Sequence, residues 1–94
     1  MAENQFNGRS LTAIAKDVAE GYVFINPHFL KRMSSENYKD LYHHLRKTLA
    51  DLRAESFPTS DTHAIRKRNI RLQRLHQATT IVEFAAKSKR ISLV

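Results

Sequence analysis

The chain has 94 residues, of which 41% are hydrophobic and 27% are charged, with no cysteine and a formal net charge of +7. This length suits one small domain, and the apolar share is too high for a fully disordered protein. The lack of cysteine excludes disulfides, zinc–thiolate sites and thiol catalysis, so that packing alone must stabilise the fold.

The first ten residues are polar and lack the cationic start and apolar block of a secretory signal. We expect a flexible leader over residues 1–10 and a single small helical domain over residues 11–94. No stretch approaches the roughly 18 apolar residues that a membrane-spanning helix needs. A cytoplasmic protein with no membrane partner is the simplest interpretation.

Residues 11–25 are compatible with two structures. The first is a short helix closed by Gly21, a residue type favoured just past a helix C-terminus, with an extended segment over 22–25. The second is a β-hairpin that turns at residues 19–21. The apolar residues of 11–19 do not alternate strictly, which favours the helix.

A second short helix is predicted to begin at Pro27. Asn26 is a good N-cap residue and proline is favoured at the first helical position. We expect this helix to run for about two turns.

The clearest helical pattern runs from about Glu36 to about Glu55. Apolar residues recur there at helical spacing and form one stripe, which predicts a core-facing helix: Tyr38, Leu41, Tyr42, Leu45, Leu49 and Leu52. Ser34 or Ser35 can cap its start.

A second long helix is predicted from about Asp61 to about Ser88. Pro58 breaks the preceding helix, Thr59 or Ser60 can cap the new one, and Asp61 suits its first turn. Its main apolar stripe holds Ile65, Leu72, Leu75, Thr79, Val82 and Ala86. A loop this short makes the two long helices antiparallel neighbours. The sequence therefore predicts an all-α fold: a long antiparallel helical hairpin with a short N-terminal helical or mixed segment packed on it.

The second long helix has apolar residues outside its main stripe. Ile70, Ile81 and Phe84 fall well away from that stripe on a helical wheel. A helix that is apolar on two sides needs a cover on both. Either the N-terminal region or a second copy of the chain is expected to cover these three residues, which makes them a candidate oligomer or partner surface.

The same helix carries the densest positive charge of the chain. Residues 48–94 hold nine Lys or Arg and four Asp or Glu. Five of these cations are a candidate polyanion-binding surface: Arg66, Lys67, Arg68, Arg71 and Arg74. Lys and Arg one turn apart can follow phosphates, but a solvated helix face has the same pattern, and no aromatic residue lies among them for base stacking.

Three further patterns are candidates for sites. Residues 11–33 have the rough order of a helix-turn-helix, but the six residues 21–26 exceed the three or four that usually join the two helices. Five histidines are present without a metal-binding pattern, although Asp40 and His44 share a helix face. Glu83, a lone carboxylate among apolar residues, is expected to pair with a cation of another element or to have a raised pKa if buried without a partner. We expect no metal, no cofactor and no enzymatic activity.

Two functions remain open. The first is a protein-interaction module that binds another protein or a second copy of itself through the apolar surface at residues 78–86. The alternative is a nucleic-acid-binding accessory protein that uses the basic face of the C-terminal helix. The first ranks ahead because exposed apolar residues need a cover, whereas a basic face needs no ligand.

Overall fold

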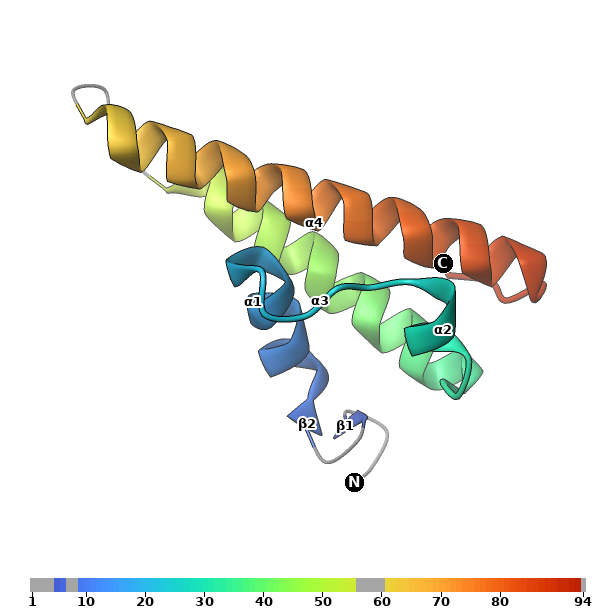
Figure 1. Ribbon diagram of the computed structural model, residues 1–94. Helices are drawn as coiled ribbons and strands as arrows, with labels where there is room; N and C mark the ends of the chain where they lie inside the picture. Colours follow the sequence, from blue (N-terminus) through green and yellow to red (C-terminus); the bar gives the residue numbers. More distant parts are fainter. Residues whose placement is uncertain (1–4, 7–8, 56–60, 94) are drawn as a thin grey trace.

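The computed structural model describes residues 5–6, 9–55 and 61–93. The protein is all-α, as the sequence predicts. Its described residues form the helices α1 (Leu11–Glu20), α2 (Pro27–Leu30), α3 (Ser35–Ala54) and α4 (Thr62–Ser88), shown in Figure 1. None of these helices is long and apolar enough to cross a membrane. In the predicted leader, β1 (Gln5–Phe6) pairs antiparallel with β2 (Arg9–Ser10).

The two long helices lie side by side. Helices α3 and α4 share the most extensive contact between any two elements, and Figure 1 shows them running in opposite directions. This arrangement is consistent with the predicted antiparallel hairpin. The connection predicted around Pro58, with its candidate caps Thr59 and Ser60, lies outside the described residues.

The N-terminal helices lie across one side of this pair. Helix α1 packs against both α3 and α4, and α2 packs against α4. The core that they enclose holds residues from every helix: Leu11, Ile14, Ala15, Val18, Ala19, Ile25, Leu30, Met33, Tyr38, Leu41, Leu45, Leu49, Leu52, Leu75, Ala78, Val82 and Ala86. The helix over 11–19 is confirmed, and the β-hairpin alternative for residues 11–25 is wrong. The helix forms because its apolar residues meet both long helices along one face.

Side-chain caps define where each helix begins. Ser10 Oγ accepts a hydrogen bond from the Ala13 amide at 3.1 Å, and Ser34 Oγ accepts one from the Asn37 amide at 3.1 Å. Asp61 is itself the N-cap of α4, since its Oδ1 accepts from the Ala64 amide at 3.2 Å. The placement of Asp61 within the first turn was therefore wrong by one position.

Helix α2 begins as predicted but is shorter than expected. Asn26 Oδ1 accepts from the Phe29 amide at 2.8 Å, and Pro27 is the first helical residue. The helix then spans four residues instead of two turns. It stops early because Met33 must turn into the core and Ser34 already caps α3.

Candidate interaction surface

The five cations Arg66, Lys67, Arg68, Arg71 and Arg74 form what we call the basic stretch of α4. They lie in two different environments. Arg71 forms a salt bridge with Glu20, with its Nη2 2.9 Å from Oε2. Arg74 donates from Nη1 to the carbonyl oxygen of Ala19 at 3.1 Å. Both partners belong to the last turn of α1, where backbone carbonyls lack partners within the helix and cations are favourable. These two arginines therefore fasten α1 to α4.

The other cations of the stretch lie nearer the beginning of α4. Arg66 and Lys67 are exposed, and Arg68 is half-buried. Arg66 and Lys67 border a shallow hollow that also includes Asp61 and Ile70. The five residues predicted as one polyanion surface thus do not form a uniform outward stripe, because Arg71 and Arg74 point to α1.

The second apolar side of α4 is only partly covered. Ile81 is half-buried and packs against the core cluster. Ile70 keeps 40% of its surface exposed, and Phe84 keeps 74%. The N-terminal segment thus covers the side of α4 near Ile81 and leaves Phe84 open.

The segment between α1 and α2 adds two exposed aromatic residues. Tyr22 is 78% exposed and Phe24 is 76% exposed, whereas Val23 is half-buried and Ile25 is buried. Successive side chains of an extended chain point to opposite sides, so that only alternate members of an apolar run can be buried. Sequence reasoning did not select Tyr22 and Phe24 as site residues. The unbroken apolar run 22–25, next to a helix that Asn26 caps, was the signal available.

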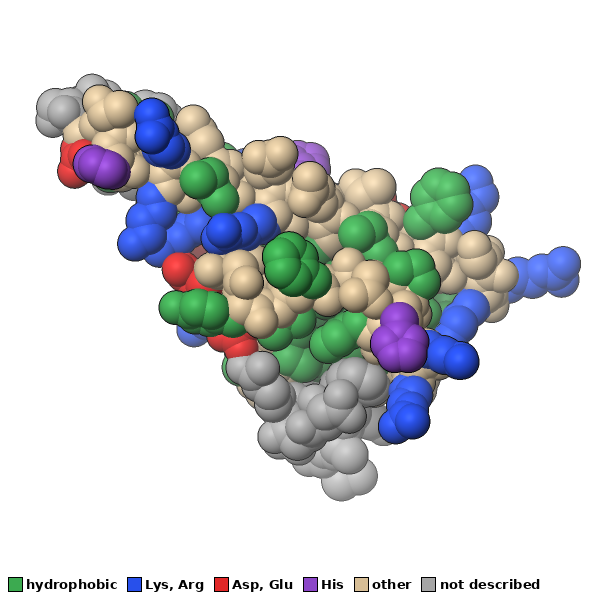
Figure 2. All heavy atoms as spheres, in the orientation of Figure 1, with side chains coloured by type: hydrophobic (Ala, Val, Ile, Leu, Met, Phe, Trp, Pro, Cys, Tyr) green, Lys and Arg blue, Asp and Glu red, His purple; other side chains and the backbone are tan. Residues whose placement is uncertain are grey.

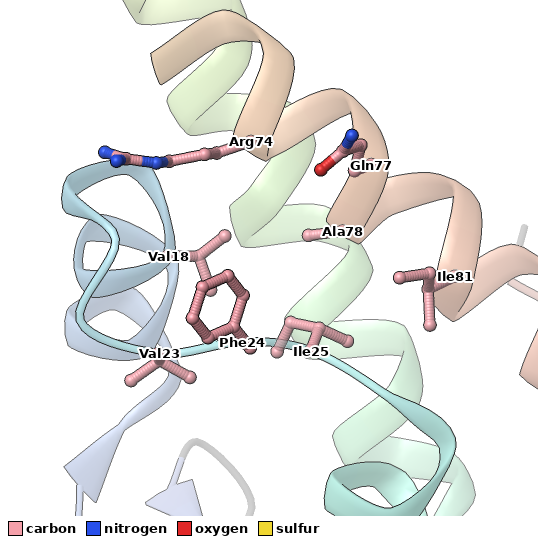
Figure 3. Close-up of a pocket in the computed structure, with 8 residues that line it drawn as sticks. All are labelled: Val18, Val23, Phe24, Ile25, Arg74, Gln77, Ala78 and Ile81. Atoms are coloured by element: carbon pink, nitrogen blue, oxygen red, sulfur yellow. The ribbon is translucent and has the colours of Figure 1, made fainter. Parts of the chain in front are cut away.

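A small hollow lies between this segment and α4. Figure 3 shows Phe24 in front of it, with Arg74 at one end and Ile81 at the other. Val18, Val23, Phe24, Ile25, Arg74, Gln77, Ala78 and Ile81 line it. Its volume is about 60 Å³, well below the roughly 300–1,000 Å³ of small-molecule sites. It cannot enclose a cofactor, but it can receive one side chain of a partner.

A larger and more open depression adjoins it, which we call the apolar groove. Pro27, Tyr38, Ile81, Phe84, Ala85, Ser88 and Lys89 line it. Its volume is about 370 Å³. Ile81 belongs to both depressions. Figure 2 shows hydrophobic side chains spread over the middle of the face in view.

Polar contacts fix one wall of the apolar groove. Tyr38 is buried and donates from its hydroxyl to the carbonyl oxygen of Leu30 at 3.3 Å. Lys89 donates from Nζ to the carbonyl oxygen of Lys31 at 3.3 Å, and the same ammonium lies 5.3 Å from the Tyr38 ring centroid. These contacts tie the end of α4 to α2 at this wall of the groove.

Glu83 lies outside the apolar groove and has a partner. Its Oε2 accepts from the Tyr42 hydroxyl at 2.9 Å, and Arg46 donates to that hydroxyl from Nη1 at 3.3 Å. Glu83 was expected to pair with a cation of another element, and it is linked to Arg46 of α3 through the Tyr42 hydroxyl. Glu83 is exposed, so the alternative of a buried carboxylate does not apply.

The histidines make separate contacts. His44 Nδ1 lies 3.3 Å from Thr12 Oγ1, and His76 Nε2 lies 3.1 Å from Arg53 Nη2. Among the residues that the structure describes, no three His, Cys, Asp or Glu side chains gather as metal ligands would. Burial lowers the pKa of His44 from its ordinary value of 6.5, with further lowering by His43.

The helix-turn-helix interpretation finds little support in the geometry. Helix α2 would be the recognition helix, yet it has four residues, and it packs against α4. A recognition helix needs several exposed residues on one free face to read bases in the major groove.

Comparisons with known protein families, with curated proteins and with solved structures found no match to this chain.

Proposed function

We propose that this protein is a small helical protein-interaction module that binds its partner through the apolar groove and the neighbouring hollow beneath Phe24. The observation that carries the proposal is the exposure of Phe84 and Phe24, at 74% and 76%, beside depressions that share Ile81. Contiguous exposed apolar surface around a depression is typical of protein contact sites. Aromatic residues are also the side chains that contribute most at such sites.

The shape of the surface favours a macromolecule over a small ligand. The hollow beneath Phe24 is too small to enclose a cofactor, and the apolar groove is open to solvent along α4. A partner protein can cover both depressions at once, with one side chain in each. A different protein and a second copy of this chain both fit this shape.

The nucleic-acid alternative ranks second. Arg71 and Arg74 are engaged with the last turn of α1, which leaves Arg66 and Lys67 as the exposed cations at the start of the basic stretch. Two exposed cations beside Asp61 make a weak phosphate surface, since each phosphate contact adds only one step of counterion release.

Site-specific photocrosslinking tests the proposal. The photoreactive residue p-benzoylphenylalanine replaces Phe84 in one variant and Arg66 in a matched control, and each variant is expressed in cells that produce the chain naturally. We expect discrete protein adducts from position 84 and few from position 66. Adducts that form mainly at position 66, or that contain nucleic acid, would contradict the proposal and support the alternative.

Sedimentation equilibrium separates the two kinds of protein partner. A concentration-dependent dimer that Phe84→Glu converts to monomer would identify the partner as a second copy. A monomer at all concentrations, together with adducts of a different protein at position 84, would identify a heterologous partner. If neither a dimer nor an adduct forms, the chain is not an interaction module of this kind.

A further inference from the structure

The rim of the apolar groove has an unusual charge distribution. Among the described residues that line it, Lys89 alone is charged. The segments 27–33 and 84–91, which contribute Pro27, Phe84 and Ala85 to the lining, also hold Lys31, Arg32, Lys87 and Arg90 and no Asp or Glu. All five cations are exposed, and we call them the rim cations. Figure 2 shows Lys and Arg side chains gathered at the end of the face where α2 and the last turns of α4 lie.

No acidic side chain within those two segments offsets this charge. Glu83, the residue before Phe84, accepts a hydrogen bond from Tyr42 and borders a separate depression together with Phe84 and Lys87. Lys89 is held by the Lys31 carbonyl, so one cation has a fixed position at the groove wall. The rim cations therefore produce a positive field around an apolar floor. This combination favours a partner whose carboxylates lie beside apolar side chains.

We infer that the occupant of the apolar groove is a short acidic, amphipathic segment of another protein. Its large apolar side chains lie against Ile81, Ala85 and Phe84, and its carboxylates face the cations of the rim. This inference rests on the proposed function and adds the chemical class of the partner. It follows the known mode in which an amphipathic segment places its apolar face in a groove and its charged face along the rim.

A second copy of this chain fits the groove less well. In a twofold dimer the same patch meets itself, so that two rims with five cations each would come together. Like charges at close range oppose association. A nucleic acid would satisfy the cations but would leave the recessed aliphatic floor at Ile81 and Ala85 without an apolar partner.

Peptide selection tests the inference directly. A phage library that displays random 16-residue peptides is selected against the whole immobilised chain, and in parallel against its Phe84→Ser variant. We expect the peptides enriched by the parent chain to carry net negative charge and at least two large apolar residues. We expect Phe84→Ser, which changes an exposed residue, to remove this enrichment while circular dichroism shows unchanged helix content.

Charge reversal at matched positions then locates the carboxylates. The most enriched peptide is labelled with fluorescein and titrated by anisotropy against Lys87→Glu, which borders Phe84, and against Lys67→Glu near the opposite end of α4. Both variants change the net charge equally. We expect binding to weaken by about fivefold or more for Lys87→Glu and by less than about twofold for Lys67→Glu, as an exposed charge acts over a short range.

The outcomes distinguish failure of the inference from failure of the proposed function. Enriched peptides that are neutral or basic, yet need Phe84, would overturn the acidic partner and leave the interaction module standing. A dimer that Phe84→Ser dissociates would also overturn the acidic partner and leave the interaction module standing. If no enrichment depends on Phe84, both the inference and the proposed function are overturned. The same holds if single-stranded RNA binds at the groove with higher affinity than any peptide.

Discussion

The guanidinium group of Arg74 lies directly over Gly21 and donates to the carbonyl oxygen of Ala19, 55 residues away in the sequence. Gly21 ends α1 in the left-handed conformation with φ of 84°. A glycine at this place serves two purposes, because it adopts positive φ without strain and leaves room for the arginine. One contact thus joins the end of α1 to the middle of α4.

Replacement of Gly21 should reveal both purposes. In Gly21→Ala the new Cβ would come within 2.8 Å of Arg74 Cζ, so that the guanidinium must move, and the positive φ would add strain. We expect a loss of about 1–2 kcal/mol in unfolding free energy from the backbone strain, measured by urea titration. Gly21→Asn, which tolerates positive φ, should lose less. In an Arg74→Ala background, Gly21→Asn should be nearly neutral, and an undiminished cost there would contradict the role of the arginine.

The arginines of α4 should differ in their contribution to stability. Arg74→Ala removes a part-buried hydrogen bond from a charged group and should cost about 1–2 kcal/mol. Arg71→Ala breaks a partly exposed salt bridge and should cost less than about 1 kcal/mol. Arg66→Ala, at an exposed position, should stay within about 0.5 kcal/mol of the parent. Equally small losses of unfolding free energy at all three positions would mean that the basic stretch is a uniform solvated face.

Truncation of a core leucine should be far more costly than truncation of an exposed aromatic residue. Leu45 is fully buried between the helices, so Leu45→Ala should cost about 2–5 kcal/mol. Phe84→Ala removes a larger side chain, but Phe84 is 74% exposed, and the change should cost less than about 0.5 kcal/mol. A large loss of stability in Phe84→Ala would show that Phe84 belongs to the core and has no free surface for a partner.

The nucleic-acid alternative has its own test at the start of α4. The double variant Arg66→Gln, Lys67→Gln leaves the contacts of Arg71 and Arg74 intact, unlike a substitution of the whole stretch. We expect the parent chain to bind mixed DNA and RNA weakly and to release them at about 0.15 M salt. Binding that persists at that salt, with a salt slope that the double variant flattens by roughly two units, would favour the alternative.

Stability should depend on pH through His44. Burial and the nearby His43 lower its pKa in the folded protein, Asp40 opposes the shift, and Lys47 adds to it. The unfolded chain therefore binds more protons near and below pH 6.5, so that the stability contributed by neutral His44 is lost as pH falls through this range. Thermal melts should show a smaller decrease between pH 7.5 and pH 5.5 for His44→Gln than for the parent. His63→Gln, at an exposed site, is the control and should keep the parent's dependence.

Much of the helical framework was predictable because it depends on local chemistry. The apolar spacing of residues 36–55 and 61–88 requires two long amphipathic helices, and Ser34 and Asn26 cap their helices through bonds to amides three residues away. Gly21 likewise marked the end of α1. These features involve residues close in sequence, so no knowledge of the packing was needed to find them.

The candidate surface was predictable only in part. The sequence identified α4 as apolar on two sides and selected Ile70, Ile81 and Phe84 as residues outside the main stripe, of which Ile70 and Phe84 are exposed and Ile81 is half-buried. It did not select Phe24, because the exposure of alternate residues in 22–25 depends on which side of that segment meets α1 and α4. It also treated the basic stretch as one surface, since the contacts of Arg71 and Arg74 with α1 span 50 residues or more.

The sequence by itself thus determined the long helices, the end of α1 at Gly21 and the apolar faces, because each depends on the periodicity and caps of neighbouring residues. The tertiary structure alone decided which cations stabilise the fold and which remain exposed, and which apolar residues the N-terminal segment covers. The physical reason is that a helix face is neither surface nor core until another element packs against it. The position of α1 commits Arg71 and Arg74 to its last turn, and the position of α2 leaves Phe84 beside an open groove.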